Sequence, residues 1–129
     1  MNLPRLALLL PFILSSCAGV QLPKEKLGDV PGALLFNGYS NPKVECFKCH
    51  NGDGRGTWRG ADLREEIPGA DDAVLTGFVM DGTGWMPPQK EFLKAEELAQ
   101  ILAWLHTQFP DPAAAPAPAP APSADAGIP

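Results

Sequence analysis

The segment Cys46-Phe47-Lys48-Cys49-His50 constrains this chain more than any other feature of its sequence. Two cysteines three positions apart on a helical turn project to neighbouring positions on one face. The histidine follows directly, so one short piece of backbone presents two thiols and an imidazole together. Such a set suits a group that is bonded covalently at two points and ligated through a metal at a third.

The C-x-x-C-H spacing is typical of c-type haem attachment, in which the thiols form thioethers with two vinyl groups and the imidazole ligates iron. We therefore expect one covalent haem c, bound through Cys46, Cys49 and His50. Three alternatives stay open: a structural zinc site, a thioredoxin-like redox pair and a simple disulfide. Zinc would need two further ligands where the domain offers only His106, and no βαβ pattern surrounds the cysteines.

A loop at residues 81–88 supplies a candidate for the second axial ligand of the iron. Met86 lies there between a tryptophan and a proline, after two glycines and before a second proline. Glycine permits backbone conformations that other residues resist, and proline stiffens the chain that leaves the turn. We expect the Met86 thioether to be the sixth ligand, whereas Met80 ends an apolar helical face and is expected to lie in the core.

Two amphipathic helices are predicted from apolar residues that recur at intervals of three and four. The first spans residues 71–80, begins with two aspartates that suit the helix dipole, and carries Val74, Leu75, Phe78 and Val79. Gly77 interrupts it, which on the residues alone merely lowers helix stability. The second helix spans residues 95–108, with Leu98, Ile101, Leu102 and Leu105.

The two ends of the chain are predicted to be separate from a folded unit at residues 30–109. Residues 1–16 have one basic residue, an apolar run and small residues, which is typical of a secretory signal peptide. Leu14-Ser15-Ser16-Cys17 resembles a lipobox, so we expect lipidation of Cys17 and a linker over residues 17–29. Residues 110–129 alternate alanine and proline, which predicts a disordered tail.

Charge and cysteine count narrow the possible partners. The formal net charge of −5 disfavours binding to a phosphate backbone, so we expect no nucleic-acid partner. Three cysteines are an odd number, which fits separate chemical roles better than a disulfide framework.

Residues 31–109 resemble a class I cytochrome c domain of the bacterial type. The similarity rests on Gly32 and Phe36 in a first helix, the haem motif, the glycines that follow it, and the Met86 loop. It implies an all-α fold with three to five helices around one covalent haem, in which Trp104 packs near the first helix. It also implies that Leu63 packs on the haem ring and that Ala61, where the family usually has proline, offers a carbonyl to the ligating imidazole. For Gly77 the resemblance suggests a second interpretation, close approach of the backbone to another element or to haem.

An iron with protein ligands on both sides has no open position for a substrate, so we expect an electron carrier and no enzyme. We also expect the protein alone to be monomeric. Membrane-bound or periplasmic redox proteins are the expected donor and acceptor, with the chain exported and lipid-anchored at a bacterial membrane. The alternative is a peroxidase-like haem enzyme or sensor in which Met86 dissociates. Arginine and indole nitrogens are donors, so we expect side chains near the haem propionates to come from Trp58, Arg59 and Trp85.

Overall fold

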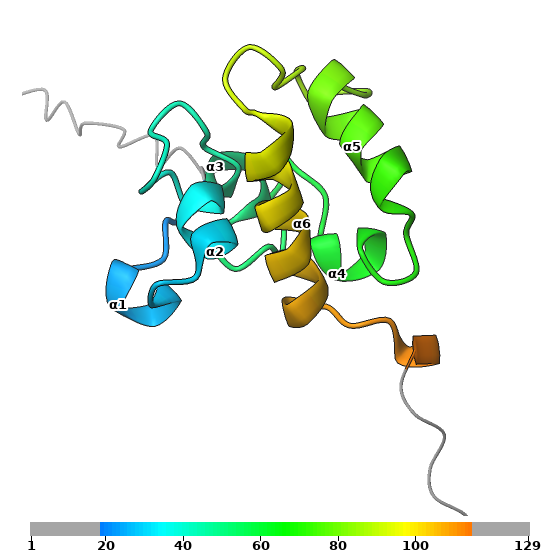
Figure 1. Cartoon of the computed structure of the whole chain (residues 1–129), viewed down its shortest axis with the longest axis horizontal. Helices are drawn as coiled ribbons and strands as arrows, with labels where there is room; N and C mark the ends of the chain where they lie inside the picture. Colours follow the sequence, from blue (N-terminus) through cyan, green and yellow to red (C-terminus); the bar gives the residue numbers. More distant parts are fainter. Residues whose placement is uncertain (1–18, 115–129) are drawn as a thin grey trace, which may run out of the picture.

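The computed structural model of the chain describes residues 19–114 (Figure 1). The predicted signal peptide, Cys17 and most of the predicted tail lie outside these residues. The elements in chain order are α1 (Lys24–Leu27), α2 (Pro31–Phe36), α3 (Phe47–His50), α4 (Leu63–Glu66), α5 (Asp72–Asp81), α6 (Ala95–Gln108) and the 3-10 helix η1 (Pro112–Ala114).

The predicted all-α fold class is confirmed. The described residues form no strand, only two isolated bridges, Thr57 with Gly60 and Thr83 with Met86. They contain six α-helices where three to five were expected, because α1, α3 and α4 are single turns of four residues each.

Helices α2 and α6 cross in close contact and build the core of the domain. A Cβ atom at Gly32 would lie 2.0 Å from the backbone oxygen of Gln100, so only glycine lets the two backbones approach this far. Beside that crossing the rings of Phe36 and Trp104 lie 5.1 Å apart at a tilt of 55°, a favourable aromatic geometry. The expected packing of Trp104 against the first helix is therefore present. The core is completed by Leu27, Ala33, Leu35, Val44, Ile67, Leu93, Leu98, Ile101, Leu102 and Leu105.

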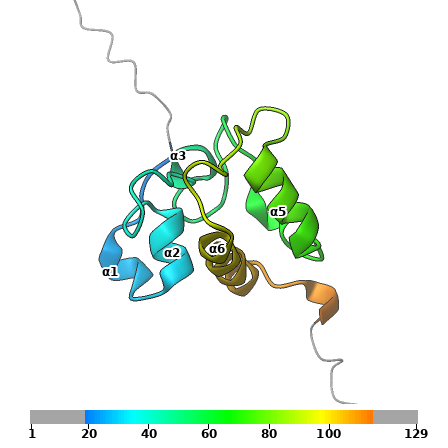
Figure 2. The ribbon, with the colours of Figure 1, turned by 45° about the horizontal axis from the view of Figure 1, so that its top comes forward.

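Helix α5 stands on the far side of α6 from α2 (Figures 1 and 2). Its N-cap is Asp71, whose Oδ1 accepts hydrogen bonds from the backbone N–H groups of Ala73 at 2.7 Å and Val74 at 3.3 Å. No residue of α5 is buried, although Met80 is partly buried against the core. A side-chain contact ties α5 to α6, where His106 Nε2 lies 2.7 Å from Asp72 Oδ1.

The structure differs from the expected linker before residue 30. Residues 24–27 form α1, and Leu27 is buried in the core. Further upstream, the Gly19 N–H donates to the Lys48 carbonyl at 2.9 Å. The polar residues of this segment predicted a linker. In the structure its backbone groups form hydrogen bonds with the domain, and its leucines pack against the core.

Candidate functional site

A cavity of about 1170 Å³ lies among α3, α4, α5 and α6. It is somewhat larger than the roughly 300–1,000 Å³ of most small-molecule sites, so it has room for a large flat group. Its wall is mostly apolar and includes core residues, which suits a hydrophobic ring system. The apolar side chains that line it include Phe36, Ile67, Leu75, Phe78, Val79, Leu93, Leu98, Ile101, Leu102 and Leu105.

The C-x-x-C-H motif forms one edge of this cavity, because Cys46, Cys49 and His50 all line it. Helix α3 is a single turn whose backbone closes through the bond from the His50 N–H to the Cys46 carbonyl at 2.9 Å. The two cysteines are not bonded to each other. The turn therefore places both thiols and the imidazole on the same cavity, as the motif predicts.

The Cys46 side chain is in an apolar setting. It is partly buried and packs against the core. Burial, with a smaller contribution from the neighbouring Cys49, raises the pKa of its thiol from 9.0 to about 12, although a backbone hydrogen bond partly offsets the rise. At neutral pH the thiol is therefore uncharged where it meets the cavity.

The orientation of His50 is fixed by the backbone of a neighbouring loop. Its Nδ1 lies 2.9 Å from the carbonyl oxygen of Ala61. A carbonyl only accepts hydrogen bonds, so Nδ1 carries the proton and Nε2 keeps a lone pair free for a metal. Alanine thus supplies the carbonyl that the resemblance assigns to proline at this place.

Met86 is held in a tight backbone hairpin on the cavity wall. The Met86 N–H donates to the Thr83 carbonyl at 2.8 Å, and the Thr83 N–H donates to the Met86 carbonyl at 3.1 Å. Gly82 has φ +79°, and a Cβ there would lie 2.8 Å from the Met86 carbonyl oxygen, so the turn requires glycine. The loop therefore presents the Met86 thioether from a defined position.

The other predicted site residues lie around the mouth of the cavity. Leu63 is half-buried and lines it, as do Trp58, Arg59 and Trp85. The side chains of Trp58 and Trp85 are 75% and 99% exposed, which places their ring nitrogens within reach of solvent. The Arg59 guanidinium lies 5.6 Å from the centre of the Trp58 ring, a cation–π arrangement.

Sequence reasoning missed four residues of the cavity wall: Thr57, Glu66, Ile67 and Leu93. Thr57 Oγ1 donates to the Cys49 carbonyl at 2.6 Å and so ties the loop after the motif back onto α3. Leu93 directly precedes the N-cap of α6, and an apolar residue there with Leu98 one turn into the helix is the pattern of a hydrophobic staple. That pattern was readable in the sequence.

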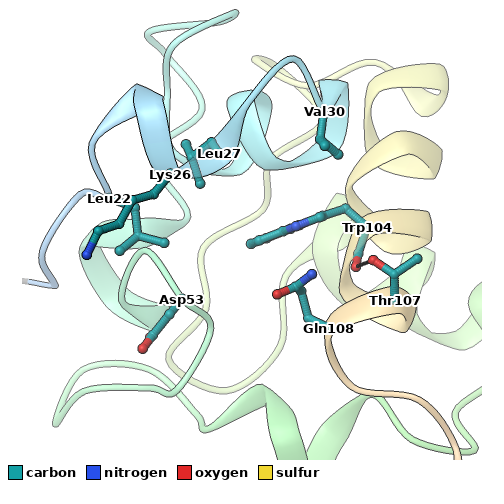
Figure 3. A pocket seen from close by; sticks show the side chains of 8 residues that line it. All are labelled: Leu22, Lys26, Leu27, Val30, Asp53, Trp104, Thr107 and Gln108. Atoms are coloured by element: carbon teal, nitrogen blue, oxygen red, sulfur yellow. Dashed lines mark hydrogen bonds between the residues drawn. The ribbon is translucent and has the colours of Figure 1, made fainter.

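A second hollow, of about 250 Å³, lies between α1 and the end of α6 (Figure 3). The indole of Trp104 extends into it from α6, opposite Leu22 and Leu27 (Figure 3). Polar side chains of Lys26, Asp53 and Gln108 complete its lining. No cysteine, histidine or methionine lines it, so the chemistry of the motif belongs to the larger cavity alone.

Comparison with known families assigns the domain. A family model described as cytochrome C oxidase, cbb3-type, subunit III matches residues 35–105, which is more than half of the chain and includes the motif, the Ala61 loop and Met86. No curated protein matches the chain.

Proposed function

The chain belongs to the family of cytochrome c oxidase, cbb3-type, subunit III, and from this membership we propose that it carries single electrons through a haem iron ligated by His50 and Met86. The family establishes a cytochrome c domain with covalent haem c on Cys46 and Cys49 and a role in haem-based electron transfer. The axial ligands and the partners are our inference.

One observation carries the ligand assignment: an imidazole and a thioether line the same apolar cavity, each on a backbone segment fixed by hydrogen bonds. His50 is oriented through Ala61 with Nε2 free, and Met86 is held by its hairpin with Thr83. When bound, haem c supplies one redox-active iron, whose reduction potential rises when a thioether replaces a second imidazole. The apolar walls keep water away from it, which favours the less charged reduced state.

The exposed rim supports a second part of the proposal. Trp58 and Trp85 each carry a ring N–H near the mouth of the cavity, and Arg59 carries a guanidinium there. These are donors without acceptor capacity, so they suit the carboxylates of a haem. We assign them to the propionates, and Leu63 to a face of the ring.

Location and partners follow from the chemistry of the family. As c-type cytochromes are extracytoplasmic, the domain works outside the cytoplasm. No helix among residues 19–114 is long and apolar enough to cross a membrane. We propose that a lipid on Cys17 holds the mature protein at the membrane, next to membrane-bound redox complexes that serve as donor and acceptor. Mass measurement of the mature N-terminus tests this anchor, and an unmodified cysteine would contradict it.

A visible spectrum of the purified holoprotein in both redox states tests the ligand pair. The reduced protein is expected to bind carbon monoxide poorly, because no position on the iron is open. Met86→Ala is expected to keep covalent haem and to gain rapid carbon monoxide binding, since it removes the thioether and leaves Cys46, Cys49 and His50 in place. Rapid binding by the unaltered protein would instead favour a peroxidase-like enzyme or sensor.

A further inference from the structure

Residues 19 and 20 lie against the haem-attachment turn α3. The Gly19 N–H donates to the Lys48 carbonyl at 2.9 Å, and the Val20 N–H donates to Asn51 Oδ1 at 2.8 Å. One residue further along the loop, the Gly52 N–H donates back to the Val20 carbonyl at 2.8 Å. Residues 19–20 therefore run beside α3 and the loop after it, bonded through their backbone.

Two glycines make this contact possible. A Cβ atom at Gly19 would lie 1.8 Å from the Phe47 carbonyl oxygen, which no side chain tolerates. A Cβ atom at Gly52 would lie 2.6 Å from the Val20 carbonyl oxygen. The segment and the turn thus touch backbone to backbone, an approach that only glycine permits.

A buried asparagine fixes the next residues. Asn37 is 0% exposed, and its Oδ1 accepts the Leu22 N–H at 3.0 Å while its Nδ2 donates to the Gly52 carbonyl at 3.1 Å. Leu22 and Leu27 then line the hollow opposite Trp104 (Figure 3). From residue 19 onward the segment is therefore attached to the domain by hydrogen bonds of its backbone.

We propose that the α3 face of the domain, the surface around Gly19, Val20 and Lys48, lies against the lipid bilayer. The inference rests on the lipid anchor at Cys17 that we propose above. Only two residue steps separate Cys17 from Gly19, about 7 Å when extended. An acyl chain on Cys17 would hold Gly19 within this distance of the membrane surface. Because Gly19 is hydrogen-bonded to Lys48 of α3, the bilayer is the surface that this face would contact.

The surroundings of Gly19 agree with this orientation. Val20 is 71% exposed, an apolar side chain next to the anchor where a bilayer surface would receive it. At the other end of the described chain, η1 lies across the domain from α3 in both views (Figures 1 and 2). The haem-attachment turn therefore faces the membrane, and η1 faces the aqueous side.

Amine footprinting tests the orientation without disturbing the haem motif. The lipidated holoprotein, carrying Ala113→Lys as a marker on η1, is bound to vesicles of neutral phosphatidylcholine and treated with a membrane-impermeant acetylating reagent. The same protein released by Cys17→Ala is the reference. We expect Lys48 to react several-fold more slowly on vesicles than after release, and the introduced marker amine to react at the same rate in both states.

A second variant separates orientation from anchoring. A flexible insertion of about ten glycine and serine residues between Ala18 and Gly19 keeps the lipid and restores slack. It is expected to leave the visible spectrum and vesicle sedimentation unchanged while the protection of Lys48 disappears. Equal Lys48 rates on vesicles and after release, in protein that sediments with them, would overturn the proposal. Protein that carries no acyl mass and stays in solution would overturn the anchor itself and leave the haem assignment untouched.

Discussion

The two halves of this domain differ in what covers their apolar side chains. In the half built by α2 and α6, apolar residues meet one another: Phe36 is 2% exposed and Trp104 is 7% exposed. In the half built by α5 and the Met86 hairpin no residue of the helix is buried, and Phe78 remains 48% exposed. Both halves have apolar sequences, yet only one of them forms a protein core.

The difference identifies the part of the fold that the cofactor completes. Leu75, Phe78 and Val79 of α5 line the large cavity, so their partner is the group that the cavity receives. Hydrogen bonds from Gln89 and Lys90 to the end of α5, at 3.0 and 3.3 Å, hold the hairpin to the helix without burying either. The first half is expected to depend on packing and the second on haem.

Removal of the haem should give the largest effect. The double variant Cys46→Ala, Cys49→Ala cannot form thioethers, and without haem α5 loses the surface that its apolar face would cover. We expect loss of covalent haem, a large loss of stability, and amide protection lost first in α5 and the hairpin. Hydrogen exchange measured by mass spectrometry should find whatever protection remains in α2 and α6. Stronger protection in α5 than in α6 would contradict the division into halves.

Truncation of Trp104 tests the packed half. Trp104→Ala removes the ring that packs at a tilt against Phe36 and leaves a void in the core, for which we expect a loss of about 3–5 kcal/mol in the free energy of unfolding. The haem spectrum should keep its form under native conditions, since Trp104 does not line the cavity. Denaturant unfolding followed by circular dichroism measures the loss, and a change below 1 kcal/mol would show that the helix crossing contributes little.

Two glycine substitutions compare the halves with the same chemical change. Gly32→Ala places a methyl group 2.0 Å from the Gln100 oxygen and 2.8 Å from Trp104 Cβ, so we expect a loss of about 1–3 kcal/mol from overpacking. Gly77→Ala meets nothing within 4 Å in the described residues and lies off the cavity wall, so we expect a gain of about 0.5–1 kcal/mol from helix propensity. Equal effects of the two changes would remove the contrast.

The packed half was largely predictable from the sequence. The interval of apolar residues in 95–108 predicted α6 with the bounds that the structure shows, and 71–80 predicted α5 within one residue at each end. The spacing of apolar residues in a helix depends only on the local sequence, so these two helices could be predicted from it. The open surroundings of Gly77 in the described residues speak against close approach to another element, and Gly77 does not line the cavity, so the interpretation in which it merely lowers helix stability is favoured.

Contacts across distant segments could not be read in the same way. Asn37 gives no sign in the sequence that it is fully buried and joins residues 22 and 52. The backbone contact of Gly19 with α3 likewise depends on how two distant segments pack together. The charged residues 24–26 favoured the prediction of a linker for the segment that follows Gly19. For the site, the motif predicted the residues on the cavity, whereas Thr57 joined it only through a loop that folds back on Cys49.

The smallest effect is expected at the N-cap of α4, beside the carbonyl that orients His50. The Arg64 side chain bonds the Asp62 carboxylate, with its Nε 3.0 Å from Oδ1, and holds the pKa of Asp62 below 3.8. The folded state therefore binds fewer protons than the unfolded state, so this contribution to stability is present above about pH 4 and is lost as the pH falls through the lowered pKa. Asp62→Asn keeps an oxygen that caps Arg64 N–H and removes only the charge.

Because the pair is at the surface, we expect the variant to have a slightly lower Tm at neutral pH. This difference should shrink toward pH 3 and with added salt, and the haem spectrum should be unchanged. Calorimetry across that pH range measures it, and a difference that grows on acidification would mean that the carboxylate has another partner.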